Sequence, residues 1–246
     1  MKGLVRTVGI LVLLGVLGFV SYRVLIGGST VSWNQRLTVI VDTPAGKVRD
    51  HSVVEITKTE TLGPLVLPEA RGVSSEVRGE AVAVEVLPGR WLFALLSGAA
   101  GSKGDADQLA YHAFRLGESR EPGVDSYRAY VRDLRAQPLD TPAPIPPEAY
   151  PLLVTFDDLA QPQTVREVDP TDLAATFGPG VTLQGMTLEI TRYGISKGKM
   201  EEILPWICDY RASHQRLNGK SGSIDATDES LSNWIGTSNF LRESCK

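Results

Sequence analysis

The chain has 246 residues, of which 42% are hydrophobic and 22% charged. This composition is that of ordinary globular proteins and excludes wholesale disorder or a collagen-like structure. The net charge is −4, and without Lys2, Arg6 and Arg23 the body has 22 basic against 29 acidic residues, a net charge of −7. A mildly acidic body predicts no nucleic-acid partner. Two cysteines and three histidines are too few for a zinc cluster or a disulfide scaffold.

The first predicted element is a membrane-spanning helix within residues 1–28. Lys2 and Arg6 precede an apolar run at 7–20, which has no charged residue. As a helix, residues 4–26 measure about 34 Å, which exceeds the roughly 30 Å hydrocarbon layer of a bilayer. The segment therefore predicts either a signal anchor that stays in the membrane or a signal peptide that is cleaved.

Of these two alternatives, retention of the segment is favoured. The best small-residue cleavage site, at 27–29, follows Arg23 and a second apolar patch, so it lies too far from the main apolar run. Tyr22 and Trp33 are aromatic residues suited to the far membrane interface. Because the basic head lies on the short side, the positive-inside rule predicts a cytoplasmic N-terminus and a periplasmic body on a single-pass inner-membrane helix.

After the anchor, the sequence predicts an α+β ectodomain that is rich in antiparallel hairpins. Two pairs of strands have alternating apolar and polar residues around turn residues. They are 36–43 with 52–57 across a turn at 44–46, and 80–87 with 90–96 across Pro88-Gly89. Four strands within about sixty residues indicate a sheet with one buried face.

Two helices and a connector follow the hairpins. The first helix is predicted to end at Leu116, with Asp105 or Asp107 as its N-cap. The second covers 125–136, where apolar residues recur at i, i+3, i+4 and i+7. Residues 138–151 contain six prolines and predict an extended connector, which either divides two subdomains or forms a strap across one domain.

Beyond the connector, short elements and a loose end are predicted. They are a buried strand at 152–156, a short helix with Asp169 as its N-cap, a half-buried strand at 186–193, a helix near 200–207 that Pro205 interrupts, and docking aromatic and aliphatic residues at Trp234, Ile235, Phe240 and Leu241. The expected organisation is an anchor at 1–28, a hairpin-rich region with two helices at 29–137, the connector at 138–151, an α+β region at 152–214 and a polar, partly flexible tail at 215–246.

One string, Gly194-Ile195-Ser196-Lys197-Gly198, matches G-x-S-x-G between a predicted strand and a predicted helix. It resembles the nucleophile elbow of the α/β-hydrolases, and this resemblance implies Ser196 as the nucleophile. The preceding strand alternates instead of being apolar throughout, and His214 is the only histidine that follows. The alternative is a strand-to-helix turn with Ser196 near the helix cap.

The remaining candidate strings predict turns or loops. They are the S-x-x-K pair Ser196 and Lys199, the GKS string at 219–221, the glycine-rich stretch 98–104, the pair Asp157-Asp158, and the dispersed histidines His51, His112 and His214. Accordingly, no catalytic, cofactor-binding or metal-binding residue is predicted, and no cofactor.

Cys208 and Cys245 would meet an oxidising compartment outside the membrane, where a pair can form a disulfide. Two free thiols are the alternative. The predicted function is non-enzymatic: a membrane-anchored envelope protein that binds or positions another protein or envelope component. The alternative function is a serine hydrolase that uses Ser196.

Overall fold

The computed structural model describes residues 28–62, 66–98, 104–117 and 126–243, together with Gly15, Gly18 and Cys245. The predicted anchor at 1–28 therefore lies outside the described residues, apart from three glycines. Within the described part of the chain, no helix is long and apolar enough to cross a membrane. The membrane anchor stays a prediction.

By its contacts the chain divides into two compact units, residues 1–32 with 57–76 and residues 33–56 with 77–246. In the first unit, β1 (Thr30–Thr43) begins and β2 (Gly46–Thr61) ends. The two strands are linked there by hydroxyl groups, since Ser32 Oγ lies 2.8 Å from Thr57 Oγ1. The short η1 (Pro68–Ala70) and most of β3 (Gly72–Arg78), which the sequence analysis did not predict, also belong to this unit.

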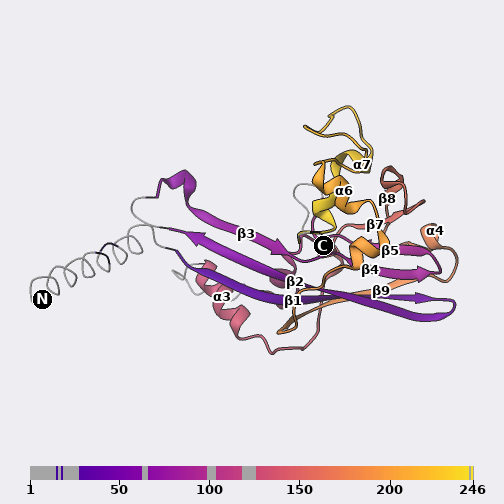
Figure 1. Cartoon of the computed structure of the whole chain (residues 1–246). Helices are drawn as coiled ribbons and strands as arrows, with labels where there is room; N and C mark the ends of the chain where they lie inside the picture. The colour runs from indigo at the N-terminus through magenta and orange to yellow at the C-terminus, as the bar shows by residue number, and fades with distance from the viewer. Residues whose placement is uncertain are drawn as a thin grey trace, which may run out of the picture. The chain divides into compact units, whose positions relative to one another are not determined.

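A five-stranded sheet has the strand order β3-β2-β1-β9-β6, with β6 at Ala143–Pro144 and β9 at Thr182–Thr191. Its strands β1, β2 and β9 lie side by side in Figure 1. β1 and β9 run antiparallel, with Leu37 opposite Leu188. Every second residue of β1 is buried, which confirms the predicted alternation. β1 and β2 are joined by the two residues between Thr43 and Gly46, where the Thr43 hydroxyl donates to the Gly46 carbonyl at 2.7 Å.

The proline-rich segment runs along this sheet. Its residues Ala143 and Pro144 pair with β9, and Ile145 and Ala149 are buried. The 3₁₀ turn η2 (Pro147–Ala149) follows. Proline lacks a backbone N–H and is therefore found at sheet edges, which is the place of β6 here.

A four-stranded antiparallel sheet has the order β4-β5-β7-β8. Its strands are β4 (Val82–Leu87), β5 (Arg90–Ala94), β7 (Leu153–Phe156) and β8 (Val165–Glu167). The β4–β5 turn is Pro88-Gly89, as predicted, and Gly89 has a φ of +71°, a conformation that glycine adopts without a steric cost. Leu37 and Val54 of the first sheet line the same small internal space as Val82 and Ala94 of the second.

The described helices are short. They are α2 (Leu109–Phe114), α3 (Ser126–Arg135), α4 (Leu173–Phe177), α5 (Lys199–Ile203), α6 (Ile207–Ala212) and α7 (Leu231–Trp234), with 3₁₀ turns η3 (Pro162–Thr164) and η4 (Thr237–Asn239). The larger unit is therefore α+β, with antiparallel sheets and short helices, as the hydrophobic patterns predicted. Residue 125, the predicted start of α3, lies outside the described residues.

Two helix starts differ from the predictions. The N-cap of α4 is Asp172, whose Oδ1 accepts from the Ala175 N–H at 3.1 Å. Asp169 instead accepts a bond from the backbone two residues on, because Asp-Pro-Thr closes a turn ahead of the helix. α2 begins after Gln108, which makes no side-chain cap bond, so neither predicted aspartate caps it.

Two tryptophans also differ from the predictions. Trp33 is only 8% exposed, and its ring packs on Tyr130 with centroids 6.1 Å apart. Its Nε1 donates to Gln35 Oε1 at 3.0 Å, so Trp33 is a core residue and not a membrane-interface residue. Trp234, which was predicted to dock, is 46% exposed, whereas Phe240 is fully buried as predicted.

An aromatic cluster joins the chain after β9 to the four-stranded sheet. Phe240 lies 5.8 Å from Phe93 of β5, and Trp206 lies 5.9 Å from Phe156 of β7. The Ala81 N–H also donates to the Phe240 carbonyl at 2.8 Å. The segment that leads to Cys245 is therefore part of the packed core.

Candidate functional site

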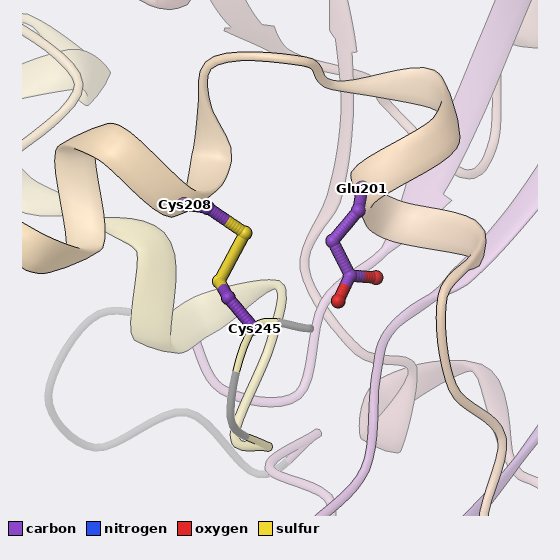
Figure 2. Close-up of side chains that lie close together, drawn as sticks. All are labelled: Glu201, Cys208 and Cys245. Carbon is purple, nitrogen blue, oxygen red and sulfur yellow. A yellow bond between two sulfur atoms is a disulfide. The ribbon is translucent and has the colours of Figure 1, made fainter.

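Cys208 of α6 and Cys245 form a disulfide in the structure, with their Cα atoms 5.8 Å apart. Glu201 of α5 lies beside this bond (Figure 2). One carboxylate oxygen of Glu201 and both sulfur atoms lie within 4.8 Å of one another. These three side chains define the sulfur–carboxylate cluster.

The bend between α5 and α6 brings Glu201 and Cys208 together. α5 ends at Ile203 and α6 starts after Trp206, because Pro205 cannot continue the helix, as predicted. Leu204 and Ile207 are fully buried, and Trp206 Nε1 donates to the Leu159 carbonyl at 2.8 Å. The cluster is therefore supported by packed side chains on both sides of the bend.

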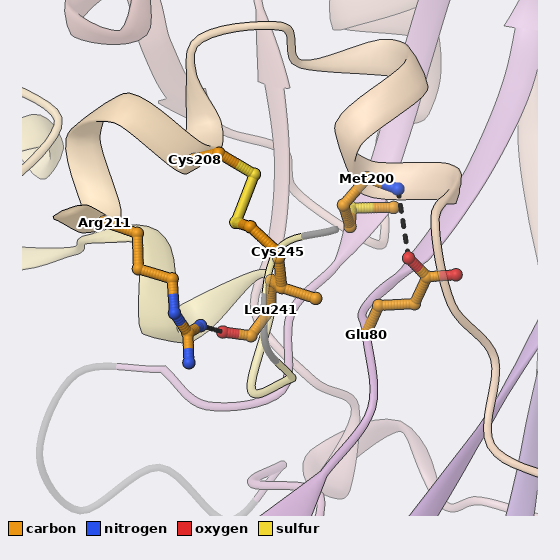
Figure 3. The surroundings of a disulfide bond; sticks show 6 residues. All are labelled: Glu80, Met200, Cys208, Arg211, Leu241 and Cys245. Atoms are coloured by element: carbon orange, nitrogen blue, oxygen red, sulfur yellow. Dashed lines mark hydrogen bonds between the residues drawn. A yellow bond between two sulfur atoms is a disulfide. The ribbon is translucent and has the colours of Figure 1, made fainter.

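A buried carboxylate fixes the start of α5. Gly198, the residue before the helix, has no side chain to cap it, and Glu80 Oε2 accepts from the Met200 N–H at 3.0 Å (Figure 3). Glu80 is 2% exposed. Burial raises the pKa of the Glu80 carboxyl, the backbone bonds from Met200 and Lys199 act in the opposite direction, and the negative charge of Glu201 raises it further.

The segment that carries Cys245 is also held by charged side chains. Arg211 of α6 donates to the Leu241 carbonyl (Figure 3). Glu243 forms ion pairs with Lys197 at 3.1 Å and with Arg78 at 3.0 Å. The bond from Lys197 and the charges of both cations hold the pKa of Glu243 below its usual value. The disulfide thus lies within a set of polar contacts between the end of β3, α6 and the segment after η4.

Ser196 has the contacts of a turn residue. Its backbone N–H donates to the Val53 carbonyl at 2.9 Å, and its Oγ accepts from the Val53 N–H at 2.9 Å. These two bonds hold Ser196 against the backbone of β2. The arrangement corresponds to the turn alternative for the G-x-S-x-G string.

The other predicted strings also have structural partners. Lys199 pairs with Asp50 and donates to the Ala83 carbonyl at 2.8 Å, so the S-x-x-K lysine is engaged away from Ser196. The two aspartates after β7 separate, as expected for neighbouring residues: Asp157 accepts from the Arg166 Nε at 2.7 Å. The second aspartate, Asp158, lies in a turn, and so does the start of the GKS string at Asn218, Gly219 and Lys220. Most of the glycine-rich stretch, residues 99–103, lies outside the described residues.

Neither Glu201 of the sulfur–carboxylate cluster nor Glu80, which fixes the start of α5, was identified from the sequence. Glu201 and Cys208 are seven positions apart, which in one continuous helix would place them on the same face but two turns apart. Pro205 interrupts the helix between them, so the spacing alone does not predict their contact. Glu80 meets the N–H of Met200 across 120 positions. No local pattern signals either contact, because each depends on how the segments after β9 pack on the sheets.

No protein-family model, curated protein or solved structure matches this chain. In the oxidised form of the sulfur–carboxylate cluster, the disulfide links α6 covalently to the segment after η4. Its sulfur atoms become metal ligands only as thiolates.

Proposed function

We propose that this chain is a single-pass, membrane-anchored protein whose body lies outside the cytoplasmic membrane. There it binds or positions another protein or envelope component, without catalysing a reaction. The observation that carries the proposal is the disulfide between Cys208 and Cys245, because such bonds form and persist in exported compartments and are rare in the cytosol. The basic head and the apolar run at 7–20 support the same orientation.

Binding is favoured over catalysis because the groups with reactive chemistry have structural partners. Ser196 Oγ accepts a backbone bond and Lys199 forms an ion pair. In the same unit, large aromatic side chains are exposed: Tyr193 to 58% and Trp234 to 46%. Aromatic residues are enriched where protein partners bind.

A reporter fusion tests the proposed topology. Alkaline phosphatase, which is active only after export, is fused after residue 246 of the full chain. The fusion should be active, and replacing Lys2 and Arg6 with glutamate should lower its activity, because the basic residues orient insertion. The matched control replaces Lys47 and Arg49, which are exposed at the start of β2, and should leave the activity unchanged. An inactive fusion, with a fluorescent cytoplasmic reporter working at the same site, contradicts the proposal.

A second experiment separates binding from hydrolysis. The membrane fraction is treated with a fluorophosphonate probe, which labels activated serines. We expect no labelling of this chain, because Ser196 is held in a turn against the backbone of β2 by the bond that its Oγ accepts from the Val53 N–H. Labelling that is lost in Ser196→Ala would support the hydrolase instead.

A further inference from the structure

An unsatisfied oxygen points to a further role for the sulfur–carboxylate cluster. Among the described residues, Glu201 Oε2 has no hydrogen-bond partner, although the atom is buried. Buried polar atoms in folded proteins are almost always bonded to protein, water or an ion. The Glu201 carboxylate and both sulfur atoms lie within 4.8 Å of one another, so an ion placed among them would contact all three groups.

The three groups have the chemistry of zinc ligands. Cysteine sulfur and glutamate oxygen both bind Zn²⁺, and thiolates discriminate against Mg²⁺ and Ca²⁺. Three protein ligands leave the fourth tetrahedral position of the ion for water. From these ligand types and their proximity, we propose that Glu201, Cys208 and Cys245 form a redox-gated zinc site, which binds one Zn²⁺ when both cysteines are reduced and none when they form the disulfide.

The backbone around the cluster can accommodate the reduced, metal-bound form. Tetrahedral zinc with sulfur ligands at about 2.3 Å needs the two sulfur atoms about 3.8 Å apart, so they must separate once their bond is broken. Glu201 and Cys208 lie on helices next to buried residues, which fixes two of the ligands. Cys245 lies outside any helix or strand, so this residue can supply the movement.

The exchange between the two forms balances in atoms and electrons. A dithiol reductant transfers two electrons and two protons to the disulfide and itself becomes a disulfide. Zn²⁺ then displaces the two thiol protons and binds both thiolates together with the Glu201 carboxylate. In the reverse direction, the two thiolates exchange with another disulfide, which rebuilds the Cys208–Cys245 bond and releases the metal ion. The other molecule leaves as two thiolates, which take up two protons from water to become thiols.

Zinc titration of the full-length protein in detergent tests this proposal. The protein is reduced with a phosphine, and bound zinc is measured by competition with a chromophoric chelator. We expect one Zn²⁺ per reduced chain and binding at least about 100-fold weaker by the oxidised chain, which has no thiolate to offer. Glu201→Gln should weaken binding by about tenfold or more. Glu202→Gln, at the neighbouring exposed position, should not change it.

Two results would overturn the proposal. One is equal zinc affinity of the reduced and oxidised chains. The other is equal affinity of the Glu201→Gln and Glu202→Gln variants. The second comparison stays informative even if reduction unfolds the protein, because an unfolded chain cannot distinguish two adjacent glutamates. The inference does not rest on the proposed function, since a failed titration leaves the result of the phosphatase fusion unchanged.

Discussion

Replacing Cys208 and Cys245 with alanine should lower the free energy of unfolding by about 4 kcal/mol, according to the chain-entropy relation for disulfides. The two cysteines are 37 positions apart, and for a loop of that length the relation gives an entropy difference of about 13 cal/mol/K, or about 3.8 kcal/mol at 25 °C. The native contacts around the bridge remain, because Phe240 is fully buried and Arg211 still donates to the Leu241 carbonyl. The loss should therefore arise from a less restrained unfolded state.

Urea denaturation, followed by intrinsic tryptophan fluorescence, measures this difference. Oxidised wild type is compared with reduced wild type and with the Cys208→Ala, Cys245→Ala variant. A chelator is present, so that bound metal does not stabilise the reduced chain. Reduced wild type should unfold at the same urea concentration as the double variant. A difference below about 1 kcal/mol between the oxidised protein and the variant would refute the loop-entropy argument.

Three further predictions concern single side chains and are measured by urea denaturation. Ser196→Ala removes the acceptor for the Val53 N–H and should cost about 1 kcal/mol; no loss would contradict the turn role. Because burial raises the pKa of Glu80, its favourable contribution is present below a pH of about 4.3 and is lost as the pH rises through the folded-state pKa. Glu80→Gln does not titrate, so the free energy of unfolding of the variant minus that of the wild type should increase from pH 4 to pH 7. A difference that stays the same over this pH range would contradict this. Phe240→Ala should cost about 3–5 kcal/mol, from a core cavity, whereas the exposed Trp234→Ala control should stay within about 0.5 kcal/mol.

Local periodicity made the hairpins and several helices predictable. In β1, Leu37, Val39 and Val41 share the buried face, which the alternation of their neighbours already indicates. Pro88-Gly89 marks a two-residue turn because glycine accepts the positive φ that the tight hairpin needs. These signals lie within a few residues of the elements that they specify.

The elements that were missed or misplaced depend on distant contacts. β1 starts at Thr30, before its predicted start, and its Trp33 is buried against Tyr130 of α3. Nothing within the sequence near Trp33 distinguishes a core tryptophan from an interfacial one. Asp169 and Asp172 both resemble N-caps, and the Pro170 turn assigns the cap to the second.

The candidate site is less predictable than the fold because the three side chains of the sulfur–carboxylate cluster and the supporting Glu80 come from four separate segments. Glu80 precedes β4, Glu201 and Cys208 lie on either side of a proline bend, and Cys245 follows η4. Their proximity results from the burial of Leu204, Ile207 and Phe240. These are apolar residues whose positions on the sheets no local pattern specifies.

The disulfide and a zinc complex would use the same two sulfur atoms, so the cluster can have only one of these chemistries at a time. Which one it has depends on the redox poise around the body and on the supply of metal. In an oxidising environment, the disulfide restrains the unfolded chain, and the Glu201 carboxylate has no metal ion to bind. In a reducing environment the same carboxylate and the two thiolates would gain a metal ion in place of the covalent bond. A structural disulfide needs only the two cysteines, whereas zinc binding also needs Glu201. The effect of substituting Glu201 therefore distinguishes a purely structural disulfide from a redox-gated zinc site.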